Sequence, residues 1–127
     1  MKRILLFAVI ILSAFNIYAS SRWVYITADT NNNDFFIDAN SITQSGDSKT
    51  YWVKVNFEKR DADGDLSAKS QFTINCRTRE LILRYFIFYD DIDGNGRVRI
   101  SSKATGDWEP IVPESINSAY YSYICKK

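Results

Sequence analysis

The chain has 127 residues, no histidine, two cysteines and a single methionine, Met1. Its 16 basic and 15 acidic side chains nearly cancel, so charge does not favour nucleic acid or an anionic membrane as a partner. Without histidine, Ser-His-Asp and Cys-His catalytic sites and histidine-bound zinc or copper are excluded. The composition therefore favours a protein that is not an enzyme and predicts no cofactor.

Residues 1–19 have the pattern of a secretory signal peptide. Lys2 and Arg3 precede an apolar run over 4–15 that only Ser13 interrupts, and Ala19 is a small residue suited to cleavage. This run is shorter than the roughly 20 apolar residues of a transmembrane helix, although an uncleaved signal anchor is the alternative. We expect cleavage after Ala19 or one or two residues later. No membrane anchor then remains, and no nearby cysteine could accept a lipid.

The remaining chain, residues 20–127, has the size of one domain. It contains Cys76 and Cys125, and an even number of cysteines in an exported chain predicts a disulfide. Such a bond should stabilise the fold by about 4 kcal/mol. Two buried free thiols, or a bond between chains, are the alternatives. We expect the protein to be exported to the periplasm or the cell surface, or to be secreted.

Strands dominate the predicted domain. β-Branched, aromatic or alternating apolar residues predict six of them. They lie at 23–27, 34–38, 50–57, 68–76, 81–89 and 97–101. Polar turns separate them, and the segment 38–42 predicts a short turn or a single helical turn.

Alternation assigns side chains to the two faces of the sheet. Tyr51 and Val53 point one way, while Trp52 and Lys54 point the other. In the strand 81–89 one face is predicted to carry Leu81, Leu83, Tyr85, Ile87 and Tyr89. Because its other face is also apolar, this strand should be covered on both sides, and its second face could serve a homodimer. Val98 and Ile100 are expected to point inward.

The segment 114–125 has apolar residues at helical spacing, just after Pro113. A bond from Cys125 to Cys76 requires Cα atoms within about 7 Å, so the helix must end on, or at the edge of, the inward face of the sheet. The sequence thus predicts an α+β domain. It consists of an antiparallel sheet of about six strands, with a disulfide-tethered C-terminal helix packed on one face.

Two acidic loops invite a metal-site interpretation. Asp91, Asp93 and Asn95 match the first half of an EF-hand loop, but its last position is Ser102 where calcium needs a bidentate Glu. A hairpin turn explains the string better, because it contains Asn-Gly, so these residues are only a weak calcium candidate. The loop 61–65 fits calcium less well still.

Three side chains are candidates for contact with a protein partner. Arg97 and Arg99 are predicted on one face of the last strand, where they could meet an acidic surface. Charges that protect an exposed strand edge are the alternative explanation. Trp52 points away from Tyr51 and Val53, and is the tryptophan expected to be exposed or at an interface.

A set of short motifs spans the domain in order. They are Trp23; Phe36-Ile37-Asp38 followed by Ser41-Ile42; Trp52-Val53-Lys54; Cys76-Arg77; Tyr89-Asp90; Trp108 to Ile111 with Pro113 and Ser115; and Cys125. In this arrangement the chain resembles the surface-adhesin protein E family of small exported bacterial proteins.

The resemblance implies a six-stranded antiparallel sheet with a disulfide-tethered C-terminal helix, and a homodimer. It also implies a non-catalytic adhesin that binds the host proteins vitronectin, laminin or plasminogen. An envelope-associated structural protein in the periplasm is the alternative function.

Overall fold

The structure, a computed structural model, describes residues 22–126. The predicted signal peptide over 1–19 lies outside the described residues, and so does the start of the predicted domain at residue 20. Within residues 22–126 no helix has the length and apolar character needed to cross a membrane.

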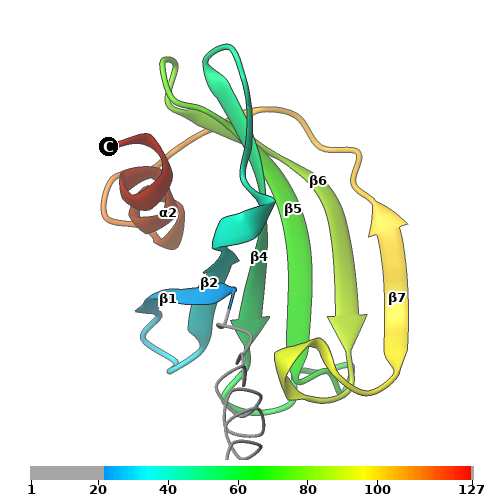
Figure 1. Cartoon of the computed structure of the whole chain (residues 1–127). Coiled ribbons are helices and arrows are strands. Elements are labelled where there is room, and N and C mark those ends of the chain that lie inside the picture. Colours follow the sequence, from blue (N-terminus) through cyan, green and yellow to red (C-terminus); the bar gives the residue numbers. More distant parts are fainter. Residues whose placement is uncertain (1–21, 127) are drawn as a thin grey trace, which may run out of the picture.

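Figure 1 shows one curved sheet with a single α-helix against one of its faces. The strands are β1 (Trp23–Ala28), β2 (Asp34–Asp38), β3 (Thr43–Ser45), β4 (Ser48–Asn56), β5 (Ser67–Asn75), β6 (Glu80–Tyr89), β7 (Val98–Lys103) and β8 (Glu109–Pro110). The helices are α2 (Ile116–Cys125) and two short 3-10 turns, η2 (Ala39–Ser41) and η3 (Ile92–Gly94). The short helical turn predicted at 38–42 is confirmed, and the side chain of Asp38 caps it by accepting from the Asn40 N–H.

The main path of the sheet runs β1-β2-β4-β5-β6-β7, and every pairing is antiparallel. The short strands β3 and β8 pair with β4 and β6. The prediction of an α+β fold with about six principal strands is therefore confirmed. Two of the eight strands are too short for residue alternation to reveal them.

The core lies between α2 and one face of the sheet. It consists of Ile37, Tyr51, Val53, Ile74, Leu81, Ile111, Tyr120, Tyr121 and Ile124. The ring of Tyr51 packs between those of Phe72 and Tyr120. A ten-residue helix is marginal alone in water, so this packing is what keeps α2 folded.

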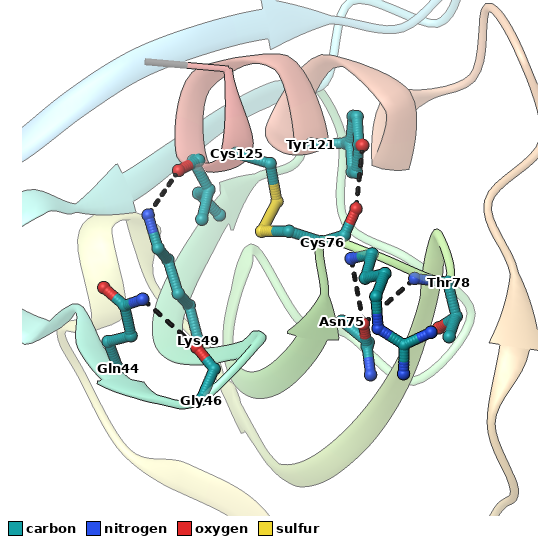
Figure 2. Close-up of a disulfide and its surroundings, with 10 residues drawn as sticks. Gln44, Gly46, Lys49, Asn75, Cys76, Thr78, Tyr121 and Cys125 are labelled. Atoms are coloured by element: carbon teal, nitrogen blue, oxygen red, sulfur yellow. Dashed lines mark hydrogen bonds between the residues drawn. A yellow bond between two sulfur atoms is a disulfide. The ribbon is translucent and has the colours of Figure 1, made fainter.

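A disulfide joins the end of α2 to the end of β5, as predicted (Figure 2). The Cα atoms of Cys76 and Cys125 lie 5.5 Å apart. Two hydrogen bonds flank the bond: the Tyr121 hydroxyl donates to the carbonyl of Cys76, and the Lys49 ammonium donates to the carbonyl of Ile124. The second places a cation at the helix C-terminus, where the helix dipole favours it.

The predicted alternation along β6 is wrong in its second half. Leu83 pairs with Phe72 but Tyr85 pairs with Gln71, so Arg84 is an extra residue in a β-bulge. The bulge moves the following side chains to the other face. Leu81 faces the core, whereas Tyr85 lies on the opposite side of the sheet.

The inward orientation predicted for Val98 and Ile100 is also wrong. Their side chains are 47% and 39% exposed. The helix lies against β1, whereas β7 forms the opposite edge of the sheet (Figure 1), so α2 does not cover these residues. A second bulge pairs Val98 with Tyr89 and Ile100 with Phe88, which leaves Arg99 as the extra residue.

Candidate binding surfaces

The sheet face opposite α2, here called the open face, carries an aromatic and cationic cluster. The register places Trp52, Gln71 and Tyr85 in one row across β4, β5 and β6, and Lys54, Lys69 and Ile87 in the next row. Trp52 and Tyr85 are in contact, with ring centroids 6.3 Å apart. Trp52 is half-buried, so its side chain packs along the sheet surface and does not project into solvent.

Lys54 is almost fully buried in the open face and is paired with Asp93. The Lys54 ammonium donates to Oδ1 of Asp93 at 3.0 Å and lies 4.8 Å from the centre of the Trp23 ring. Asn56 donates to the same Asp93 oxygen and accepts from the Asp93 N–H. The Asn56 hydrogen bond, followed by that of Lys54, lowers the pKa of Asp93. The turn η3 is thereby held against one end of the open face.

These contacts also show how the residues of the weak calcium candidate are used. Asp93 faces Lys54, and Oδ1 of Asp91 accepts from the N–H of Ile92. Among residues 22–126, the acidic side chains close enough together for a metal are instead Asp61, Asp63 and Asp65. Arg99 lies against that acidic cluster, and its guanidinium provides the positive charge that balances Asp63 and Asp65.

Arg99 and Arg97 have different environments. Arg99 contacts both carboxylate oxygens of Asp65, and its closest approach is 2.7 Å. The carboxylate of Asp65 is 1% exposed, so Arg99 balances a buried charge. Arg97 is 85% exposed and reaches Asp90 only at 3.8 Å. Sequence reasoning missed the role of Asp65, because its partner lies 34 residues along the chain.

Together with β7, Arg97 forms an exposed strip. We define the β7 edge as Arg97, Val98 and Ile100, which are all exposed. In the described part of the chain no strand pairs with the outer side of β7. The β7 edge combines a largely exposed cation, two exposed apolar side chains and an outer strand edge that no described strand pairs with, which are the elements that strand pairing with a partner requires.

A cavity of about 340 Å³ opens on the open face near β1. Its lining combines apolar and charged side chains. They are Arg22, Trp23, Asp38, Trp52, Lys69, Ile87 and Tyr89. Arg22 is paired with Asp38 at 2.7 Å. Of the residues predicted from sequence to contact a partner, only Trp52 lies at this cavity; Arg97 and Arg99 belong to the β7 side of the sheet.

Solved structures with the same fold come from Haemophilus influenzae. Protein E from a non-typeable strain is 18% identical, with a TM-score of 0.64, over 86% of this chain and 78% of that one. A second crystal form of Haemophilus influenzae protein E has 17% identity and a TM-score of 0.65, over 86% and 91% of the two chains. At this identity the likeness shows a shared fold.

No curated protein matches the chain in sequence. The sequence profile of the family described as surface-adhesin protein E, however, matches residues 23–126. The match runs from the first residue of β1 to the residue after α2 and includes both cysteines. The chain belongs to the surface-adhesin protein E family.

Proposed function

We propose that this chain is an exported, non-catalytic binding protein that acts as an adhesin and contacts its protein partners through the β7 edge. Its membership of the surface-adhesin protein E family, over residues 23–126, is the observation that carries the proposal. Vitronectin, laminin and plasminogen are the host proteins that we propose as partners. The chain has no histidine, and both cysteines are joined in the disulfide, so neither residue type supplies a nucleophile or base.

The β7 edge supports this choice of surface. A partner segment in extended conformation can add to an unpaired strand through backbone hydrogen bonds. Val98 and Ile100 then provide apolar contacts, and Arg97 attracts an acidic side chain of the partner. Arg99 borders the same strand, but its ion pair with Asp65 leaves it less available. Trp52 provides a second contact, at the cavity of the open face.

Interferometry with the domain over residues 20–127 tests this function. We expect saturable binding to at least one of the three host proteins at about micromolar concentration. The combined change of Arg97→Ala and Val98→Ser should weaken that binding about ten-fold, because it removes a charge and an apolar contact. Val112→Ser is the matched control, since Val112 is 61% exposed in the segment between β8 and α2. Absence of binding to all three proteins would contradict the adhesin proposal.

A structural role in the periplasm or envelope is the second candidate function. The observation that favours it is that the first cysteine of the chain is Cys76, so no cysteine near the predicted cleavage site could carry a lipid. Cell fractionation separates the two functions. Surface labelling of intact cells supports the adhesin, and a wholly soluble periplasmic pool supports the structural role.

A homodimer through the second apolar face of β6 is proposed alongside either function. After the bulge that face carries Tyr85 and Ile87, which are half-buried in the single chain. Sedimentation equilibrium should give twice the mass of the domain, and Ile87→Lys should reduce it to the monomer mass. A monomer at all concentrations would exclude the dimer.

A further inference from the structure

Two lysines lie directly opposite each other on the open face. Lys54 on β4 pairs in register with Lys69 on β5, so both ammonium groups project from the same side of the sheet. Like charges opposite each other on adjacent strands are destabilising. A sheet that carries such a pair needs negative charge to compensate both members.

Only one of these lysines has a carboxylate in direct contact among the described residues. Lys54 is paired with Asp93 at 3.0 Å, and the other acid beside the cavity, Asp38, is paired with Arg22 at 2.7 Å. Within residues 22–126 the Lys69 ammonium contacts the rings of Trp23 and Tyr89 and forms no salt bridge, and Asp38 and Asp93 act on it only at longer range. In and beside the cavity the three cations Arg22, Lys54 and Lys69 thus meet only two carboxylates, and Lys69 is the cation that has no carboxylate in contact.

The position of Lys69 is defined by packing. Its ammonium lies 5.5 Å from the ring centres of Trp23 and of Tyr89. Its hydrocarbon stem passes over Gly94, where a Cβ would collide with Cε of Lys69 and where φ is +72°. Burial lowers the pKa of Lys69, the charges of Lys54 and Arg22 lower it further, and those of Asp38 and Asp93 offset this only in part. The lysine is therefore held at the cavity between aromatic rings at a cost to its own charge.

We propose that this cavity binds a small ring-bearing carboxylate, with the carboxylate on the Lys69 ammonium and the ring against the indoles of Trp23 and Trp52. A ligand with one negative charge would pair with the one cation that has no carboxylate in contact. The aromatic side chains that line the cavity favour a ligand with a flat or cyclic group. The volume of about 340 Å³ lies at the small end of the range for ligand pockets. Aromatic acids and sugar acids share this chemistry.

Titrations followed by tryptophan fluorescence test the proposal on the domain over residues 20–127. The probes are phenylacetate and glucuronate, each compared with its uncharged counterpart, phenylacetamide or glucose. We expect at least one carboxylate to bind saturably, and its counterpart to bind about ten-fold more weakly, which is the value of one charge-assisted hydrogen bond. The stronger probe identifies an aromatic or a sugar ligand. Equal binding of charged and uncharged probes, or no saturable binding of either carboxylate, overturns the proposal.

Variants assign the binding to Lys69. Lys69→Met should remove the preference for the charged probe while keeping or raising the melting temperature, because it relieves the repulsion by Lys54. Should that variant fail to fold, Lys69→Gln serves the same purpose. Lys59→Met, at an exposed loop position, is the control and should leave binding unchanged. Unchanged carboxylate binding in both Lys69 variants would assign the site elsewhere and overturn the proposal.

Discussion

At the scale of single residues, the charged side chains of this protein serve different purposes. Arg99 and Lys54 each reach an acidic group from a distant loop, and one member of each pair is nearly inaccessible to solvent. Arg97 has no comparable partner. Removing the partner of a buried charge strongly destabilises the folded state, whereas an exposed ion pair adds little to stability. Residue type alone does not separate these cases.

This difference can be measured by comparing two arginine variants. Arg99→Met leaves the buried Asp65 carboxylate without its cation and should lower the melting temperature by about 10 °C. Arg97→Ala should change it by no more than about 2 °C, because the Arg97 side chain is largely in water. Differential scanning calorimetry of both variants checks the prediction. Equal effects would show that the Asp65 pair contributes no more than a surface contact.

Asp93 predicts a specific dependence of stability on pH. Its pKa is lowered by the Asn56 hydrogen bond and then by Lys54, so the folded state holds this carboxylate charged below its ordinary pKa of 3.8. The stabilisation is complete above that value and is lost as the pH falls through the lower, folded pKa. Asp93→Asn should therefore lower the free energy of unfolding at pH 7 and flatten its fall towards pH 3.

Urea unfolding at pH 7 and pH 3 measures this effect. Asparagine tolerates the left-handed backbone at position 93, where φ is 62°, so the variant changes charge with little backbone strain. Asp107→Asn, at an exposed position, is the matched control and should keep the acid dependence of the unchanged protein. The assignment is wrong if Asp93→Asn loses as much stability on acidification as the control does.

At the scale of elements, α2 depends on its tether. The helix has ten residues, and three of them, Tyr120, Tyr121 and Ile124, are buried. Lys49 and Tyr121 add hydrogen bonds on either side of the disulfide (Figure 2). The helix in turn covers the core face beside β1, so detaching it would expose the aromatic core.

Removing the disulfide should destabilise the whole domain. The bond closes a separation of 49 residues, for which chain entropy gives about 4 kcal/mol. Urea unfolding with and without reductant, and of the double variant Cys76→Ala, Cys125→Ala, checks this value. Reduction should lower the midpoint to that of the double variant. A midpoint unchanged by reduction would mean that packing alone holds α2.

At the scale of the whole molecule, one helix and one sheet share a single core. The core residues come from β2, β4, β5, β6, α2 and the segment before the helix, and they form one cluster. The open face and the β7 edge lie outside that cluster. The domain thus separates a stabilising face from surfaces that can bind a partner.

A single core predicts cooperative unfolding. Far-ultraviolet circular dichroism and tryptophan fluorescence should give the same urea midpoint, because no element has a separate core of its own. Two of the three tryptophans, Trp23 and Trp52, line the cavity of the open face, whereas circular dichroism follows the backbone of the sheet and of α2, so the probes report on different parts of the domain. Midpoints that differ would show that the domain does not unfold in a single cooperative step.

Much of the fold could be predicted from local pattern. Alternation of apolar and polar residues located the six principal strands, and helical spacing located α2. The even number of cysteines in an exported chain predicted the disulfide between Cys76 and Cys125. These features depend on residues close in sequence, or on a choice among only two cysteines. The bulges at Arg84 and Arg99 could not be predicted, because one extra residue leaves no signature in an apolar strand.

The sequence by itself determined the strands, the helix, the disulfide and the absence of histidine chemistry, because composition and short-range periodicity are properties of the chain alone. Only the tertiary structure decided that Lys54 and Lys69 face each other, that Asp93 reaches the first of them, and that Arg99 balances Asp65. These outcomes depend on strand register and on loops that meet across dozens of residues. A shift of one residue would reverse the faces and change every such pair.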